Sequence, residues 1–99
     1  TASYVMAGPS SGTNRAFGSS CHGAGRAMSR TEARQKIDGA KVKRELADKG
    51  VAIYETNEKY LSEEAPDAYK NIDDVINLTE KAGLARPVAR LKPLIVIKG

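Results

Sequence analysis

The feature of this sequence that most constrains its fold is an unbroken apolar run, Leu94–Ile97, directly after Pro93. Four consecutive aliphatic residues are typical of a strand that is buried on both faces, because a half-exposed strand alternates apolar and polar side chains. The run is too short to span a bilayer. The chain has 99 residues, with four tyrosines, one phenylalanine and no tryptophan. The core around such a strand must therefore be built mainly from alanine, valine, leucine and isoleucine.

Helix signals divide the middle of the chain. Ser29 and Glu32 form a capping box, in which two side chain-to-backbone hydrogen bonds start a helix. Gly50 and Gly83 are each placed to end a helix at its C-terminus. The sequence therefore predicts three helices: one from Ser29 to a break at Asp38–Gly39, one over residues 40–49 and one over residues 72–82.

Short strands are expected around these helices, in mixed order. Extended structure is favoured over residues 1–7, 16–20, 51–54 and 94–97. The polar stretch 55–71 is expected to be an irregular connection, and connections of that length in a small domain tend to be functional or to wrap a neighbour. The fold class that follows is α+β, with mixed short strands and three helices.

The net charge of +4 is spread unevenly along the chain. Residues 1–31 and 84–99 carry no carboxylate, whereas residues 32–83 carry nine basic and twelve acidic side chains. Either both acid-free ends face an anion, or the unevenness is chance. The single cysteine excludes an internal disulfide and fits a reducing compartment. Because no signal-peptide pattern opens the chain, we expect a soluble, cytoplasmic protein with no membrane partner.

The strongest candidate for chemistry is the stretch Phe17–Arg26, which reads Phe-Gly-Ser-Ser-Cys-His-Gly-Ala-Gly-Arg. It holds the only histidine, His22, and the only cysteine, Cys21. The residues after His22 leave space around the imidazole, expose backbone N–H groups and add a guanidinium, which are the groups that a phosphate-handling site uses. Residue chemistry alone therefore indicates a candidate anion site at His22. It leaves Tyr69 open, either as a lid packed on the core or as a stacking surface for a base.

Four stretches of the chain carry a further resemblance when they are taken in order. They are Thr1–Val5, Phe17–Arg26 with Met28–Arg30 behind it, Glu63–Lys70 and the ending Ala89–Gly99. In these motifs, and over its whole length, the chain resembles the C-terminal part of the RtcB family of RNA-splicing ligases. The resemblance implies that residues 1–99 are one segment of a larger RtcB-type catalytic domain rather than an independent domain.

Members of that family join an RNA 3′-phosphate or 2′,3′-cyclic phosphate end to an RNA 5′-hydroxyl end, using GTP and manganese. By this resemblance, His22 is the nucleophile that attacks the α-phosphorus of GTP and carries GMP. The same resemblance assigns contacts with GMP to Ser3, His22, Gly23, Ala24, Gly25, Tyr69 and Lys98. Arg26 is a candidate contact for a phosphate or RNA, although a structural salt bridge is the favoured alternative for it.

The resemblance also implies what this chain lacks. The family's manganese ligands are an aspartate, a cysteine and several histidines that lie upstream of Thr1, and Cys21 does not match the ligand cysteine. We therefore place no metal in this chain and expect it to be inactive alone. The implied partners are RNA, with tRNA halves as the expected substrate, the remainder of the ligase polypeptide, and an accessory activating protein of the kind that some members use. Two alternatives stay open: a non-catalytic nucleotide- or RNA-binding module, and a structural fragment with a core histidine.

Overall fold

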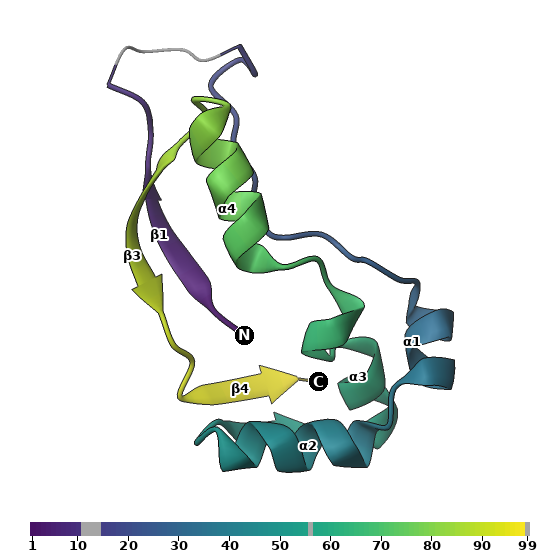
Figure 1. The fold of residues 1–99 in the computed structure, drawn as a ribbon. Helices are drawn as coiled ribbons and strands as arrows, with labels where there is room; N and C mark the ends of the chain where they lie inside the picture. Colours follow the sequence, from purple (N-terminus) through teal and green to yellow (C-terminus); the bar gives the residue numbers. More distant parts are fainter. Residues whose placement is uncertain (11–14, 56, 99) are drawn as a thin grey trace. The chain divides into compact units, whose positions relative to one another are not determined.

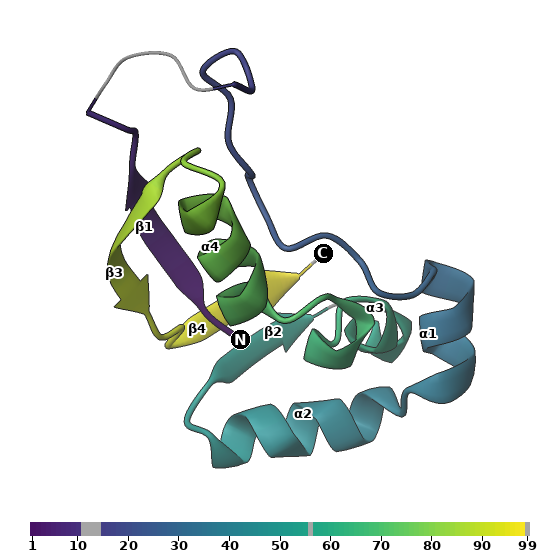
Figure 2. The same cartoon turned by 45° about the horizontal axis from the view of Figure 1, so that its top comes forward.

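The computed structural model describes residues 1–10, 15–55 and 57–98, with the backbone alone for Glu55 and Lys98. Helices and short strands follow one another in mixed order (Figures 1 and 2). In chain order they are β1 (Ser3–Ala7), α1 (Arg30–Lys36), α2 (Gly39–Asp48), β2 (Ala52–Glu55), α3 (Glu58–Glu63), the 3₁₀ helix η1 (Pro66–Ala68), α4 (Ile72–Lys81), β3 (Arg86–Leu91) and β4 (Ile95–Lys98).

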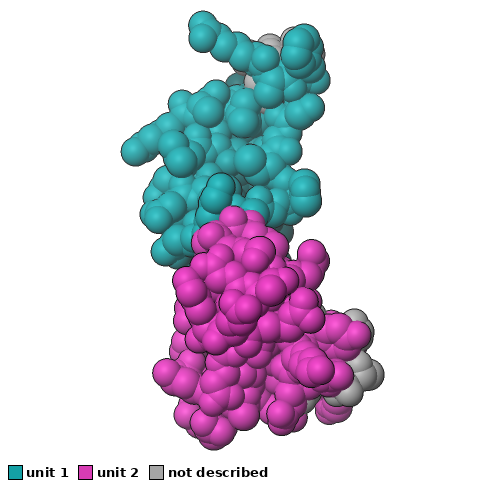
Figure 3. Space-filling model, turned by 90° about the vertical axis from the view of Figure 1, so that its right-hand side faces the viewer, with its two compact units in different colours: residues 1–25, 70–92 teal, residues 26–69, 93–99 magenta. Residues whose placement is uncertain are grey.

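These elements belong to two compact units, which Figure 3 shows in different colours. Unit 1 comprises residues 1–25 and 70–92, and unit 2 comprises residues 26–69 and 93–99. The mixed helix-and-strand composition confirms the α+β class.

Unit 1 is a two-stranded antiparallel sheet packed against one helix. β1 pairs with β3, and a bulge interrupts the register between Val5 and Met6. Strand alternation places Tyr4 and Met6, both half-buried, on the face that α4 covers (Figure 1). The Tyr4 hydroxyl donates a hydrogen bond to Asp73 of α4 at 2.5 Å, which ties the helix to the sheet.

Unit 2 packs the helices α1, α2 and α3 beside the parallel strand pair β2–β4. α3 contacts both α1 and α2 (Figure 2). Gly39, the first residue of α2, is buried, and a Cβ there would lie 2.6 Å from the Glu58 carbonyl oxygen. Only glycine therefore lets α2 begin this close to α3. The small apolar core of unit 2 consists of Ala33, Val42, Val51, Leu61, Ala65 and Ala68.

Each sheet exposes one face in the described residues. Four exposed residues of β1 and β3 point away from α4, and we call them the open face of unit 1: Ser3, Val5, Ala89 and Leu91. In β2 and β4 the exposed set, the open face of unit 2, is Ala52, Tyr54, Ile95 and Ile97. Their neighbours Ile53 and Val96 point to the opposite face and are half-buried. Both open faces are largely apolar.

The three helices predicted from the sequence are confirmed in α1, α2 and α4. The Ser29 hydroxyl oxygen accepts a hydrogen bond from the Glu32 N–H at 3.1 Å, as expected for an N-cap. Gly50 and Gly83 follow α2 and α4 with φ values of 76° and 71°, the left-handed conformation that a helix end requires. The break between the first two helices is also present, but Gly39 already belongs to α2.

The expectation of an irregular connection over residues 55–71 is wrong, because the stretch contains α3 and η1. The Asn57 side chain accepts a hydrogen bond from the Lys59 N–H at 3.0 Å and caps α3. Helix α3 has six residues, which is too short to display a helical hydrophobic period in the sequence. Its stability comes from the burial of Leu61, which is 5% exposed, among the other helices of unit 2.

Two further expectations are corrected. Residues 16–20 were expected to be extended, but the Ser19 N–H donates to the Ala16 carbonyl at 2.9 Å and closes a turn, with Phe17 at a φ of 56°. The apolar run 94–97 contributes β4 as predicted, yet Ile95 and Ile97 are 61% and 78% exposed. The predicted burial on both faces is therefore not present in this chain. Within the described residues, no helix combines the length and the apolar character that a membrane span requires.

Candidate functional site

The histidine-bearing stretch lies in unit 1, between the turn at residues 15–18 and Arg26. Cys21, His22 and Gly23 are exposed, and Ala24 is half-buried. Gly25 has a φ of 75°, and its carbonyl accepts a hydrogen bond from the Lys70 N–H at 3.0 Å. That bond fixes the end of the stretch, whereas His22 is exposed to solvent.

Arg26 and Tyr69 are the two predicted site residues that the structure brings into direct contact. They form an isolated antiparallel bridge, and the adjacent Ala27 N–H donates to the Ala68 carbonyl at 2.9 Å. The guanidinium carbon of Arg26 lies 4.9 Å from the centre of the Tyr69 ring. One Arg26 N–H donates to the Tyr69 hydroxyl at 3.2 Å, while the hydroxyl itself donates to the Glu64 carboxylate.

The remaining donors of Arg26 are used within unit 2. The guanidinium donates to the Glu63 carbonyl at 2.5 Å and to the Met28 carbonyl at 3.0 Å. It also lies 3.5 Å from the Glu64 carboxylate, and the Arg26 side chain is 22% exposed. The structural salt bridge expected for Arg26 is thus present, and a phosphate or RNA contact by Arg26, which stays a prediction, would compete with these partners.

Two arginines of α1 extend this cluster. Arg30 Nε lies 3.6 Å from a Glu63 carboxylate oxygen and 3.7 Å from a Glu64 carboxylate oxygen, and Arg34 Nε lies 3.3 Å from Glu63. The Glu63 side chain is 12% exposed, and its burial is tolerated because cations surround it. We call these residues the arginine–glutamate cluster: Arg26, Arg30, Arg34, Glu63 and Glu64.

The electrostatics of Tyr69 follow from the cluster. Its hydrogen bond to Glu64, together with burial and the negative charge of Glu64, raises the pKa of the Tyr69 phenol, and the charge of Arg26 opposes this. The phenol therefore stays protonated at neutral pH, and its proton is held by Glu64.

The sequence alone gave no role to Glu63 and Glu64, although both belong to the stretch Glu63–Lys70 that carries the family resemblance. One sequence feature could have indicated that these glutamates pair with arginines. Arg30 and Arg34 are spaced i, i+4 on α1 and have no acidic partner on the same helix face, so their partners must come from elsewhere in the chain.

The other predicted site residues are distributed over both units. Ser3 is exposed on the open face of unit 1, opposite Leu91 in the strand register. Lys98 is the last residue of β4, where its backbone pairs with Glu55. Gly99, the last residue of the fourth motif, lies outside the described residues. By unit, Ser3 and His22–Gly25 belong to unit 1, and Arg26, Tyr69 and Lys98 belong to unit 2.

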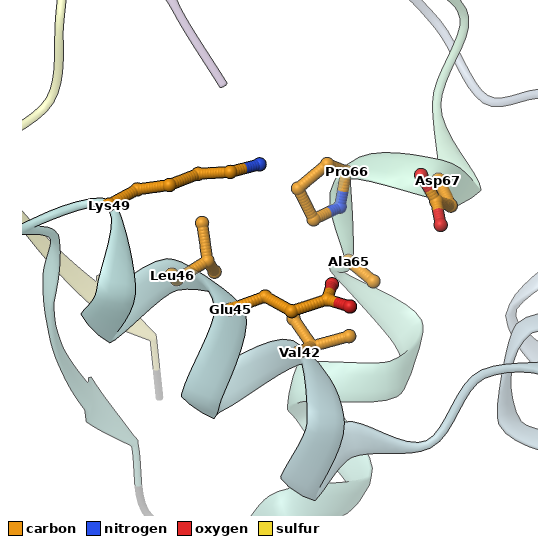
Figure 4. A pocket seen from close by; sticks show the side chains of 7 residues that line it. All are labelled: Val42, Glu45, Leu46, Lys49, Ala65, Pro66 and Asp67. Atoms are coloured by element: carbon orange, nitrogen blue, oxygen red, sulfur yellow. The ribbon is translucent and has the colours of Figure 1, made fainter.

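A small pocket in unit 2 is lined by none of these residues. It lies between residues 42–48 of α2 and Ala65–Asp67, with Lys49, which follows α2, at its rim (Figure 4). Its volume of about 60 Å³ holds a few water molecules, far less than the roughly 300 Å³ that a small-molecule site needs. Within the described ranges, no group of three or more histidine, cysteine, aspartate or glutamate side chains is arranged to hold a metal ion.

Comparison of the sequence with known proteins shows which family this chain resembles. The family model described as tRNA-splicing ligase RtcB matches residues 1–99. The chain is 43% identical over 99 residues to the tRNA-splicing ligase RtcB of Pyrococcus abyssi (strain GE5 / Orsay). It is 42% identical over the same length to the protein of that name from Pyrococcus horikoshii (strain ATCC 700860 / DSM 12428 / JCM 9974 / NBRC 100139 / OT-3). Each alignment covers the whole chain and 11% of the relative's own length.

Proposed function

The chain belongs to the family of tRNA-splicing ligase RtcB, and on this premise we propose that it is the nucleophile-bearing segment of an RNA ligase. The ligase joins an RNA 3′-phosphate or 2′,3′-cyclic phosphate end to a 5′-hydroxyl end, with tRNA halves as its substrates. The observation that carries the proposal is the 43% identity to a named tRNA-splicing ligase over every residue of the chain.

In the proposed reaction, His22 is the catalytic nucleophile. A ring nitrogen of His22 attacks the α-phosphorus of GTP, a P–N bond forms, and pyrophosphate leaves with the electrons of the broken P–O bond. An oxygen of the RNA 3′-phosphate then displaces His22 and takes the guanylate. Finally, the RNA 5′-hydroxyl attacks the activated 3′-phosphate and gives up its proton to solvent, and GMP leaves with the electrons of the broken P–O bond. The exposure of His22 supports this role, because the attacking nitrogen must reach a bulky substrate.

The proposed GMP pocket uses the residues around this nucleophile. The backbone of Gly23, Ala24 and Gly25 approaches the phosphate and the nucleoside closely, which the absence or small size of their side chains permits. Tyr69 holds the base, and Ser3 and Lys98 complete the contacts. We place the manganese ligands in the remainder of the polypeptide, where the ion would neutralise phosphate charge.

We further propose that residues 1–99 act as part of a longer ligase and are inactive alone. The chain spans 11% of the length of the curated relatives it matches. The open face of unit 2 supports the same view, because a parallel strand pair such as β2–β4 is ordinarily covered on both faces. The side chains of Ile95 and Ile97 would be buried by the remainder of the polypeptide.

Covalent labelling tests the proposal directly. The ligase that contains this chain is incubated with manganese and GTP radiolabelled in the α-phosphate, and the protein is separated from free nucleotide under denaturing conditions. Wild type should retain label, and His22→Ala should lose it entirely because no P–N bond can form. The neighbouring substitution Cys21→Ala is the matched control and should leave labelling intact. Label that persists in His22→Ala would remove His22 from the role of nucleophile.

A further inference from the structure

We propose that Arg26 and Glu64 are positioning residues, which hold the Tyr69 ring in the orientation in which it stacks on the guanine base of GTP. The inference rests on the proposed function, because it concerns the same nucleotide pocket. It gives a role to two members of the arginine–glutamate cluster, the two that contact Tyr69: Arg26 and Glu64 act through the Tyr69 ring and do not themselves contact the substrate.

The backbone fixes where Tyr69 stands. The bridge between Arg26 and Tyr69 is flanked by the hydrogen bond from the Lys70 N–H to the Gly25 carbonyl, at 3.0 Å, and by the Ala27–Ala68 bond at 2.9 Å. Residues that face each other in such a pair have neighbouring side chains. The side chains of Tyr69 and Arg26 are therefore neighbours where they begin at the backbone.

The side chains then fix how the ring is turned. The guanidinium carbon lies 4.9 Å from the ring centre, so one face of Tyr69 is occupied by a cation. Arg26 is itself held by the Glu63 and Met28 carbonyls at 2.5 and 3.0 Å, and it cannot swing away without losing both bonds. At the far end of the ring, the hydroxyl donates to Glu64 and accepts from Arg26 at 3.2 Å.

This arrangement specifies what Tyr69 can offer a nucleotide. Its hydroxyl proton is used by Glu64, so the ring is better suited to stacking than to hydrogen bonding. Because Tyr69 is only half-buried, part of its ring surface remains accessible. A ring that is already oriented loses little conformational freedom on binding, and that loss otherwise weakens affinity. Removing Arg26 should therefore weaken GTP binding without changing the chemistry at His22.

The test measures KM for GTP and kcat separately during multiple-turnover RNA ligation by the ligase that contains this chain. Arg26→Gln should raise KM by about two- to tenfold, the value of one immobilised side chain, and leave kcat nearly unchanged. Tyr69→Ala should raise KM by about five- to 150-fold, the range for base stacking. The double substitution should be no worse than Tyr69→Ala, since Arg26 acts only through that ring.

A matched control separates this role from general loss of structure. Arg34→Gln breaks an ion pair with Glu63 at 3.3 Å in the same cluster but does not touch Tyr69, so KM should stay at the wild-type value. If Arg26→Gln does not fold, Arg26→Lys and Glu64→Gln are measured instead, and each should raise KM for GTP.

Three results would overturn the inference. They are equal KM values for Arg26→Gln and Arg34→Gln, additive effects in the double substitution, and a fall in kcat with KM unchanged. An unchanged KM in Tyr69→Ala would remove Tyr69 from the proposed pocket and the inference with it. Loss of label in His22→Ala would still support the ligase, so the two failures are distinguishable.

Discussion

Unit 1 and unit 2 hold their helices in place by different means. In unit 1, the Asp73 carboxylate of α4 accepts hydrogen bonds from Tyr4 at 2.5 Å and from Arg90 at 3.1 Å, and the Asp73 and Arg90 side chains are 47% and 49% exposed. In unit 2, the helices meet through buried aliphatic side chains, and Leu61 is 5% exposed. Exposed polar contacts contribute little to stability, whereas buried aliphatic side chains contribute most of it.

The difference between the two units matches the different roles proposed for His22 in unit 1 and Tyr69 in unit 2. His22 lies in an exposed, glycine-rich stretch of unit 1, and a nucleophile needs open approach to its substrate. Tyr69 belongs to unit 2, where Arg26 and Glu64 hold its ring. We therefore expect substitutions in the packed part of unit 2 to reduce stability strongly and comparable substitutions in unit 1 to have much smaller effects.

The largest expected effect comes from a pair of leucines, one in each unit. Leu61→Ala in unit 2 should lower the free energy of unfolding by about 2–5 kcal/mol, because it removes buried methyl groups and leaves a cavity. Leu78→Ala in unit 1 should change it by less than about 0.5 kcal/mol, because Leu78 is 67% exposed. Urea denaturation of both variants measures the difference. Equal losses would break the comparison and would show that Leu78 is covered in the protein tested.

A glycine in unit 2 should give the next largest effect. In Gly39→Ala the new methyl would lie 2.6 Å from the Glu58 carbonyl oxygen and 3.0 Å from Ser62 Oγ, so α2 and α3 must move apart. Overpacking of this kind costs about 1–3 kcal/mol. Gly8→Ala is the control in unit 1, since a Cβ at Gly8 meets no atom within 4 Å. Thermal unfolding of the two variants should show a clear loss only for Gly39→Ala, and equal melting temperatures would contradict the tight contact.

Local signals allowed α1, α2 and α4 to be predicted, because a cap or a terminal glycine acts within a few residues of its own position. The cap at Ser29 and the left-handed Gly50 are both of this kind. Helix α3 could not be predicted in the same way. It depends on the packing of α3, with its buried Leu61, against α1 and α2, and such contacts between distant segments leave no period in a six-residue stretch.

The candidate site likewise has one part that could be predicted from local sequence and one part that depends on the fold. The histidine with its following glycines was visible in the sequence, because the chemistry of a phosphate site depends on residue types that are adjacent in the chain. The contact between Arg26 and Tyr69 joins residues that are 43 positions apart. Its third member, Glu64, approaches only because η1 turns the chain between Glu64 and Tyr69. No spacing rule relates these three residues, so their association required the fold.

The smallest expected effect concerns the polar contacts of unit 1 and their dependence on pH. The hydrogen bonds from Arg90 and Tyr4 hold the pKa of Asp73 below its ordinary value of 3.8. Since the folded pKa is the lower one, the stabilisation by ionised Asp73 is fully present above pH 3.8 and is lost as the pH falls through the folded pKa. Asp73→Asn should therefore be less stable than wild type at pH 7, and the difference should shrink under acid conditions.

Asp74→Asn provides the matched control, because both aspartates lie in the first turn of α4 and share the field of its N-terminus. Arg90 and Tyr4 bond to Asp73, so the pH-dependent loss should be larger for Asp73→Asn than for Asp74→Asn. Urea denaturation at a series of pH values between 7 and 3 measures both. Identical pH profiles would mean that the helix terminus, and not the contacts with Tyr4 and Arg90, stabilises ionised Asp73. The contacts of Asp73 with Tyr4 and Arg90 would then contribute no measurable stability. The difference in stability between the polar contacts of unit 1 and the packed helices of unit 2 would be larger than we expect.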